Sequence, residues 1–294
     1  MISAWSKLTP VLLAVPLFAQ SALERRIAAI AAEAQGRVAV ACSLTGTDLR
    51  CDLNPHAHPP MQSVFKLPLA ISALHMIENG KLSLDRPVRF LASDRILPQT
   101  LSPLQDKCPA AEVDVPLREL LRLAVSLSDN TAADVVLRVI GGPAAVDAYI
   151  GAGGGFHLQD NEAGLHRDHA AQYRNWWEPA AAVALLRRLD EASPLTPAHT
   201  ALLLGWMRDS PTAGRRIGAE LPAGTVVRHK SGTSFTERGL TAATNDIGLI
   251  TLPDGRHLAI AIFVTDSRAD QATRERAIAR IARAAYDGAV AAGM

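Results

Sequence analysis

The sequence predicts an α+β protein with two lobes, in which both ends of the chain build an antiparallel sheet and a helical lobe is inserted between them. Residues 37–44 and 49–53 have the composition of strands, and strand-like segments return only in the last quarter of the chain. The region between has the apolar periodicity of helices separated by turns. With 294 residues, of which 48% are hydrophobic, the chain can bury the core of one large domain.

The N-terminal residues 1–22 are predicted to be a signal peptide. Lys7 precedes an apolar run at 11–19, which small and polar residues follow. A buried helix and a membrane anchor are the alternatives, but the run is too short to cross a bilayer and Pro16 interrupts it. We therefore expect a protein secreted to a bacterial periplasm, with no membrane contact once the signal is removed.

The first elements after the signal are a helix at 22–35 and the two strands. If the turn between the strands is a two-residue hairpin loop, the register places Cys42 opposite Cys51, close enough for a disulfide. An unbonded pair of small hydrophobic residues is an equal alternative. Cys108 stays unpaired in either case, because the chain has three cysteines.

The remaining elements follow in chain order. Helices are expected at 64–78, 116–125, 131–140 and 179–191. Strands and a closing helix are then expected at 225–230, 246–252, 257–265 and 271–287. Pro68 predicts either an irregularity in the first of these helices or a helix that begins near Ser63.

These elements predict two lobes with a cleft between them. The α/β lobe is expected to comprise residues 23–60 and 212–294, and the helical lobe residues 61–211, together forming one domain. The junction of such lobes is a usual place for a small-molecule site. The balance of 30 Lys and Arg against 29 Asp and Glu, without a basic stripe, argues against nucleic acid as a partner.

Ser63 and Lys66 form a Ser-x-x-Lys pattern at the start of a predicted helix. This spacing puts both side chains on one helical face, where the amine can accept or relay the hydroxyl proton and so activate the serine as a nucleophile. Alone the pattern is weak, because roughly one match is expected by chance in a chain of this size. An ordinary helix start is the alternative.

Ser128, Asp129 and Asn130 lie between two predicted helices. All three residue types are preferred at helix N-caps, which is the structural alternative. In a cleft, the Ser128 hydroxyl can pass a proton to a leaving nitrogen while the Asn130 amide holds a substrate carbonyl. The two interpretations are compatible with each other.

Lys230, Ser231, Gly232 and Thr233 end a predicted strand. The glycine lets a ligand approach the backbone closely, and the lysine supplies a cation for a carboxylate. A solvated lysine at a strand end is the alternative for this motif by itself. The joint occurrence of all three motifs in this order favours a catalytic interpretation.

In these motifs the sequence resembles the class A serine β-lactamases, for which Ser-x-x-Lys, Ser-Asp-Asn and Lys-Thr-Gly are the signature set. The resemblance runs across the mature chain and is greatest toward the PER/VEB-like extended-spectrum branch. The segments that carry it are MQSVFK, LPQTLSP, HKSGTS and TAATNDIGLITLPDG, at 61–66, 97–103, 229–234 and 241–255.

The resemblance implies an Ω-like loop at 156–177. Glu162 falls on the general base that activates the deacylating water, and His166 falls on a position that helps to hold this water. Asp160 and Ala163 replace the usual Arg and Pro beside the glutamate. The usual salt bridge and backbone geometry of the loop are therefore in question.

The resemblance also implies how substrate is bound. The backbone N–H groups of Ser63 and Thr233 would form the oxyanion hole. Arg216 falls where some members keep a guanidinium near the substrate carboxylate, with Arg215 as the alternative after a one-residue shift, and Leu101 replaces an aromatic residue at the cleft mouth. The implied catalytic residues are Ser63, Lys66, Ser128 and Glu162, and the implied substrate-binding residues are Asn130, Lys230, Ser231, Gly232, Thr233, Arg216 and His166.

The predicted function is hydrolysis of penicillins and cephalosporins, which confers antibiotic resistance, through a Ser63 acyl-enzyme that a Glu162-activated water deacylates. Lys66 and Glu162 are both expected bases for acylation. A penicillin-binding DD-peptidase and a non-hydrolytic β-lactam or peptidoglycan sensor are the alternatives, and Glu162 argues against both.

No cofactor or metal is expected. The histidine pairs at 56 and 58 and at 166 and 169 have spacings that could ligate zinc, but the sequence places no third ligand beside them. The protein is expected to be a monomer whose partners are small-molecule β-lactams.

Overall fold

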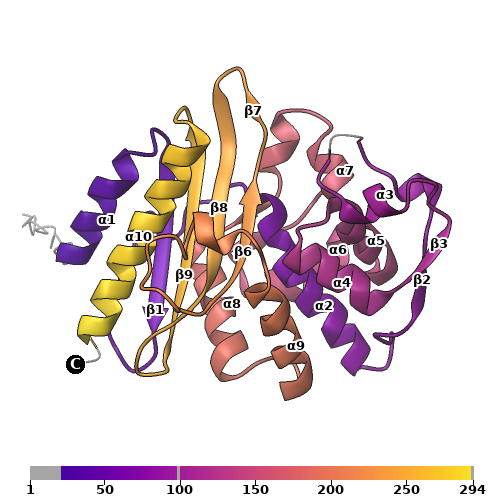
Figure 1. Cartoon of the computed structure of the whole chain (residues 1–294), viewed down its shortest axis with the longest axis horizontal. Coiled ribbons are helices and arrows are strands. Elements are labelled where there is room, and N and C mark those ends of the chain that lie inside the picture. The colour runs from indigo at the N-terminus through magenta and orange to yellow at the C-terminus, as the bar shows by residue number, and fades with distance from the viewer. Residues whose placement is uncertain (1–20, 98–99, 293–294) are drawn as a thin grey trace, which may run out of the picture.

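The computed structural model describes residues 21–97 and 100–292 (Figure 1). Within this part of the chain, the largest sheet has five strands in the order β1-β9-β8-β6, with the short β7 also paired to β8. All of these pairs are antiparallel. The strands are β1 Arg37–Leu44, β6 Val227–Thr233, β7 Thr236–Glu237, β8 Leu240–Thr251 and β9 His257–Ser267.

The sheet separates two hydrophobic cores, and β9 contributes to both because its side chains alternate between the faces. Ile260 and Ile262 belong to the core under α1 and α10, whereas Ala261 and Phe263 belong to the core shared with the helical lobe. The helix α8 packs on this second face against β1 and β9 (Figure 1). The covering helices are α1 Ala22–Ala32, α8 Pro179–Glu191 and α10 Gln271–Ala292.

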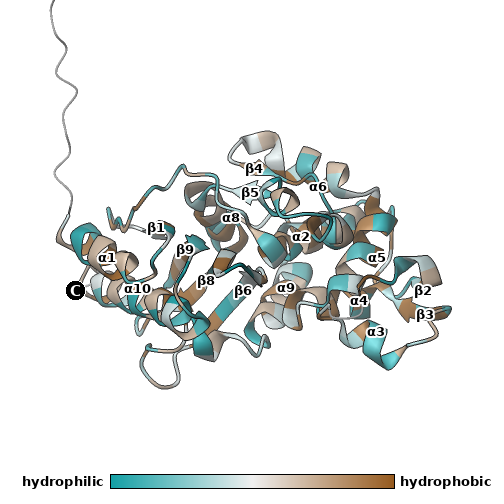
Figure 2. Ribbon diagram, turned by 90° about the horizontal axis from the view of Figure 1, so that it is seen from above, coloured by the Kyte–Doolittle hydropathy of each residue, from teal (hydrophilic) through white to brown (hydrophobic). Residues whose placement is uncertain are grey.

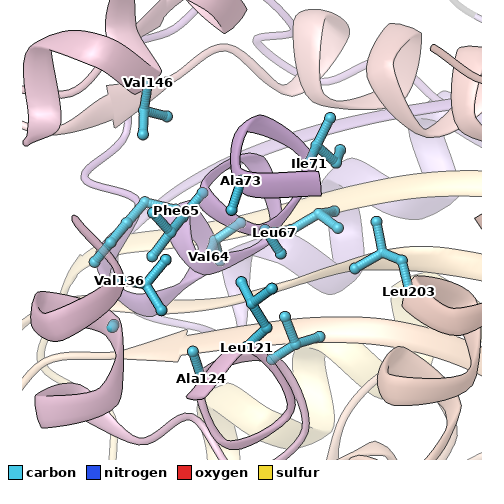
Figure 3. Close-up of a cluster of buried hydrophobic side chains, with 14 of the residues drawn as sticks. Val64, Phe65, Leu67, Ile71, Ala73, Leu121, Ala124, Val136, Val146 and Leu203 are labelled. Atoms are coloured by element: carbon cyan, nitrogen blue, oxygen red, sulfur yellow. The ribbon is translucent and has the colours of Figure 1, made fainter. Parts of the chain in front are cut away.

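The helical lobe is organised around α2, which is apolar on nearly every side (Figure 3). Its residues from Lys66 to Leu74 are all buried, and α4, α5, α6 and α9 pack around it. Pro68 lies in the first turn of α2, where its missing N–H removes no intrahelical bond. The helices of this lobe are η1 Gln62–Phe65, α2 Lys66–Glu78, α4 Leu117–Ser126, α5 Asn130–Ile140, α6 Pro143–Ile150 and α9 Pro197–Arg208.

Shorter elements complete the fold. Two small antiparallel sheets of two strands each pair β2 with β3 and β4 with β5. In the view from above, α1 and α10 lie together at one end of the molecule, and β2, β3 and α3 lie at the other (Figure 2). The bounds are β2 Pro87–Phe90, η2 Ala92–Asp94, α3 Pro103–Lys107, β3 Val113–Pro116, η3 Gly151–Gly153, β4 Phe156–His157, α7 Glu162–Leu165, η4 Ala170–Tyr173, β5 Trp176–Trp177 and η5 Ala213–Arg215.

The predicted α+β class is confirmed, but the strand expected at 49–53 is wrong. That segment makes a single antiparallel bridge, from Leu53 to Val40, while β1 pairs along its length with β9. The bridge has the register expected for the hairpin, because 40 with 53 and 42 with 51 belong to one antiparallel alignment. Cys42 and Cys51 accordingly form a disulfide, with their Cα atoms 5.5 Å apart.

Two expectations fall wholly or partly on residues that the structure does not describe. Residues 1–20 of the predicted signal peptide lie outside the described residues, and so do positions 98 and 99 of the LPQTLSP segment. Among the described residues, no single helix is both long and apolar enough to cross a membrane. In the described part of the chain, one pair of consecutive helical segments, α5 and Pro143–Gly153, is long and apolar enough when the two are counted as one span, but they meet at a bend of 76°.

Removing the disulfide with Cys42→Ala and Cys51→Ala is expected to lower the free energy of unfolding by about 2–3 kcal/mol, because the bond restricts the unfolded chain. Urea denaturation of the oxidised protein and of the double variant measures this difference. Cys108→Ala, which removes the unpaired cysteine, is the control and should change the free energy far less. Equal stability of the double variant and the native protein would contradict the prediction.

Candidate active site

The candidate site lies where η1 and the start of α2 meet β6, at the junction of the two lobes (Figure 1). Gly232 explains how closely these elements approach. A Cβ atom built on Gly232 would lie 2.6 Å from the carbonyl oxygen of Met61 and 3.2 Å from the backbone nitrogen of Ser63. The glycine is therefore required by contact between two parts of the protein, in addition to the ligand approach expected from the sequence.

Asn245 on β8 strengthens the same junction. Its Nδ2 donates to the carbonyl oxygens of Pro60 and Met61, at 2.8 and 3.2 Å. The asparagine is fully buried, so these bonds are shielded from competing water. Gly232 and Asn245 together hold the turn that carries Ser63 against the sheet.

The reactive centre consists of Ser63, Lys66 and Glu162. The Lys66 Nζ lies 2.9 Å from the Ser63 Oγ and 2.8 Å from the Glu162 Oε1, and the Ser63 Oγ donates to that same carboxylate oxygen at 3.1 Å. The three groups thus form a closed triangle of two hydrogen bonds and one ion pair. The side chain of Lys66 is fully buried and that of Glu162 nearly so, which strengthens the charge interaction between them.

The Lys66 ammonium is also held from the α4–α5 turn. Its Nζ donates to the carbonyl oxygen of Ser128 at 2.9 Å and to the Oδ1 of Asn130. The Asn130 amide donates in turn to the Thr100 Oγ1 at 2.7 Å. Asn130 therefore orients the lysine and keeps one N–H free of these two contacts for a substrate carbonyl.

In the Ser-Asp-Asn motif one residue caps a helix, and the other two contact the lysines of the site. Asp129 is the N-cap of α5, accepting from the Ala132 N–H, and it also binds the Ser102 hydroxyl and the Leu104 N–H. Ser128 has a left-handed backbone, with φ 56°, which directs it out of the helical path. Its Oγ accepts from the Lys230 Nζ at 2.9 Å.

Lys230 is the second buried lysine of the site, 1% exposed. Its Nζ also donates to the carbonyl oxygen of Ser231 at 2.9 Å. Burial, and after it the charge of Lys66, lowers the pKa of Lys230 well below the usual 10.5. An anionic group bound beside this nitrogen would offset both effects, so the site favours a ligand with a carboxylate.

Arg216 is buried beneath the end of β6, whereas Arg215 is exposed. Of the two arginines expected from the sequence, Arg216 is therefore the one that supports the site. The guanidinium of Arg216 donates to the Thr233 Oγ1 at 2.6 Å and to the Gly232 carbonyl oxygen at 3.1 Å. Glu275 on α10 pairs with it at 3.2 Å. Arg216 therefore acts on the strand end through Thr233.

The Ω-like segment has its own anchors in place of the usual salt bridge beside the glutamate. Asp160 pairs with Arg174, with 2.6 Å between Oδ2 and Nε. The buried Asn175 accepts from the N–H groups of Gln159 and Asp160 and donates to the Asp160 carbonyl oxygen. No cis peptide bond occurs among the described residues, so the Glu162–Ala163 bond is trans.

His166 follows α7 and faces the loop after β6. Its ring lies 5.6 Å from that of Phe235, which is itself largely exposed. The Nε2 of His166 is buried and has no protein partner in the part of the chain that is described. This polar atom can hold a water molecule or a substrate group. Leu101, which is expected at the cleft mouth, is 58% exposed.

Asp134 is a site residue that no motif in the sequence singles out. From α5 its carboxylate accepts the N–H of Glu162 at 2.7 Å and that of Ala163 at 3.0 Å, and so holds the start of α7. Burial, and after it the charge of Glu162, raises the pKa of Asp134 from 3.8 to about 7. Only its approach to α7 in the folded chain distinguishes it from other helical carboxylates.

Three of the four histidines in the two pairs contact carboxylates. His56 and His58 each contact one oxygen of Glu178, at 2.9 and 3.2 Å, and His169 contacts Glu237 at 3.3 Å. Among the residues described, no group of three or more His, Cys, Asp or Glu side chains is arranged to hold a metal ion.

Asp134 makes the stability of the fold depend on pH. Because its pKa is raised in the folded protein, folding takes up a proton between about pH 4 and about pH 7, and the contribution of Asp134 to stability is lost as the pH rises through this range. The native protein should therefore lose stability relative to Asp134→Asn between about pH 4 and about pH 7. Urea denaturation across this range measures the difference.

The control for this prediction is Asp85→Asn, because the side chain of Asp85 is 88% exposed. Its stability difference from the native protein should stay constant over the same range. Parallel pH curves for the native protein and Asp134→Asn would show that Asp134 does not titrate there.

Comparison with known proteins agrees with this geometry. Residues 22–289 match the Beta-lactamase enzyme family. The chain is 42% identical over 236 residues to the extended-spectrum β-lactamase PER-1 of Pseudomonas aeruginosa, covering 80% of this chain and 76% of that protein. It is 38% identical over 272 residues to a β-lactamase of Bacteroides uniformis, covering 91% of each. It is also 34% identical over 242 residues to β-lactamase VEB-1 of Pseudomonas aeruginosa, covering 80% and 79%.

Solved structures give the same result. A β-lactamase from Chitinophaga pinensis superimposes with a TM-score of 0.87 at 41% identity, covering 92% of this chain and 100% of that one. The TLA-1 extended-spectrum β-lactamase superimposes with a TM-score of 0.88 at 36% identity, covering 92% and 99%. With Ser63 on η1, directly before α2, and the three motifs gathered around it, the chain belongs to the β-lactamase enzyme family as a class A serine β-lactamase.

Proposed function

We propose that the protein hydrolyses penicillins and cephalosporins through an acyl-enzyme on Ser63, and that this activity confers antibiotic resistance. The observation that carries the proposal is the position of the Ser63 Oγ, within hydrogen-bond distance of both Lys66 and Glu162. A serine that contacts a carboxylate base and a lysine able to relay its proton is an activated nucleophile. The same contact supports Glu162 as the base for a second step, in which water attacks the acyl-enzyme.

Acylation begins when the Ser63 Oγ attacks the carbonyl carbon of the lactam ring. The hydroxyl proton leaves to Glu162, either directly or through Lys66 after that lysine has passed its own proton to Glu162. The backbone N–H groups of Ser63 and Thr233 stabilise the oxyanion. Gly232 supports this arrangement, because it lets the end of β6 approach the Ser63 nitrogen closely.

The leaving nitrogen receives its proton from Ser128. The Ser128 Oγ already accepts a hydrogen bond from the Lys230 Nζ, which leaves its own O–H to donate elsewhere. As the C–N bond breaks, this proton passes to the ring nitrogen, and Ser128 is resupplied through the adjacent lysines. The substrate carboxylate is bound by Lys230, Ser231 and Thr233, with Arg216 behind Thr233.

Deacylation requires a base that faces the ester, and Glu162 has that position. It takes a proton from water while the water oxygen attacks the ester carbonyl, and the Ser63–carbonyl bond breaks. His166, with its unpartnered Nε2, helps to hold this water. A penicillin-binding DD-peptidase or a sensor would be acylated without this second step.

The resemblance to extended-spectrum relatives favours oxyimino-cephalosporins among the substrates. We further propose that the protein acts as a monomer in a bacterial periplasm after its signal peptide is removed. The disulfide between Cys42 and Cys51 is consistent with an oxidising compartment.

Glu162→Gln is expected to trap the acyl-enzyme. Intact-mass measurement during turnover of a chromogenic cephalosporin should show a stoichiometric adduct, and kcat should fall by about a thousandfold or more, because the general base is lost. The native protein should hydrolyse the same substrate rapidly and in the presence of EDTA. Fast turnover by the variant would remove Glu162 from deacylation.

Glu178→Gln is the matched control, because Glu178 is a carboxylate whose side chain is only 20% exposed and which directly follows the Ω-like segment. It should turn over normally. A stable adduct formed by the native protein itself would instead favour a penicillin-binding protein or a sensor.

A further inference from the structure

Three hydroxyl groups form a row that leads to the expected carboxylate site. The Ser210 Oγ lies 3.2 Å from the Thr212 Oγ1, which lies 3.1 Å from the Ser231 Oγ. Ser210 and Thr212 belong to the segment between α9 and η5, and Ser231 lies on β6 next to Lys230. The mechanism above uses Ser231 alone among these three.

The direction of the hydrogen bonds in this row is open without substrate, because either hydroxyl of each pair can be the donor. A hydroxyl has one O–H and two acceptor lone pairs. A substrate carboxylate is ionised at neutral pH and only accepts. When it binds beside Ser231, the Ser231 O–H must turn to it, and the lone pairs of Ser231 then need another donor.

The neighbouring Thr233 already has such a donor. Its Oγ1 accepts from the guanidinium of Arg216, which cannot accept a hydrogen bond, so the Thr233 O–H is always free to point outward. Ser231 has no contact of this kind through its side chain among the described residues, apart from that with Thr212. Its Oγ therefore depends on Thr212 for the corresponding orientation.

We propose that Thr212 is a positioning residue, backed by Ser210, that orients the Ser231 hydroxyl as a donor to the substrate carboxylate. In the bound state Ser210 donates to Thr212, Thr212 donates to Ser231, and Ser231 donates to the carboxylate. The reverse direction would turn lone pairs of Ser231 toward the anion, which repels them. This inference rests on the proposed function, because it requires the carboxylate to bind beside Lys230.

Because Ser231 is buried, the orientation of its hydroxyl depends on the neighbouring hydroxyl groups of the row. Ser231 is 8% exposed, so little water is available to replace a missing donor. Without the Thr212 hydroxyl, the Ser231 Oγ lacks the donor that fixes its orientation, and the loss of about one hydrogen bond corresponds to about a tenfold change in affinity. Thr212 is partly exposed, so removal of the Ser210 hydroxyl should have a smaller effect.

The test compares Thr212→Val with the native protein on one cephalosporin and on the methyl ester of its ring carboxylate. The variant keeps the shape of threonine and loses only its hydroxyl. We expect kcat/KM for the acid to fall by about five- to tenfold, with kcat changed less than about twofold, and kcat/KM for the ester to stay unchanged. Thr212→Ser should restore the native value for the acid.

The matched control is Thr200→Val, which removes a threonine hydroxyl from another Thr–Ser hydrogen bond, to Ser193 at 2.7 Å. It should treat acid and ester as the native protein does. An equal loss for acid and ester in Thr212→Val, or no loss for either, would overturn the proposal.

Two further measurements separate failure of this inference from failure of the proposed function. Turnover of the acid by the native protein tests the function itself. Ser231→Ala tests whether the carboxylate lies beside Ser231, because it should lower kcat/KM for the acid only. If Ser231→Ala lowers kcat/KM for the acid only and Thr212→Val does not, the row of hydroxyl groups has no orienting role. The proposed function would remain intact.

Discussion

The structure depends most on the burial of two lysines within one small site. Removing an ammonium group from water costs several kcal/mol unless the surrounding protein compensates for it. Lys66 has this compensation from Glu162, from a backbone carbonyl and from the Asn130 amide. Lys230 has only neutral oxygens as direct partners in the contacts described, and its pKa is lowered accordingly. The charge of Lys66 is thus compensated by Glu162 within the protein. Lys230 lacks such an anionic partner until a ligand with a negative charge binds beside it.

This difference explains why parts of both lobes must meet at the site. The partners of Lys66 come from α5 and α7, whereas Lys230 is held on β6. Ser128 connects them, because its carbonyl oxygen binds one lysine and its hydroxyl oxygen the other. A shift of one lobe against the other would break several of these bonds together. The close contact at Gly232 resists such a shift.

The sequence predicts the parts of this arrangement that are encoded locally. Ser63 and Lys66 share a helical face by spacing alone, and the strand-like composition at 246–252 and 257–265 predicts the second half of β8 and most of β9. Other features arise only from tertiary contact. Asp134 resembles any helical carboxylate until α7 packs over it. The segment at 49–53 lies along the free edge of β1 but pairs with it only through Leu53, because its contact there is completed by the Cys42–Cys51 disulfide and not by a ladder of hydrogen bonds. The helix α9 is not among the elements predicted from the sequence, although its N-cap Thr196 and Pro197 at its first position are helix-start signals.

The pairing of β1 with β9 also constrains how an active molecule can arise. Arg37 lies opposite Thr265, so the sheet joins the beginning of the described chain to its last strand. Contacts between such distant segments form late and slowly, since the intervening chain must first be brought together. A partly synthesised or partly exported chain has no completed sheet against which the Ser63 turn can rest. Activity should therefore appear all at once, after the last strand has been released, and not gradually as the chain lengthens.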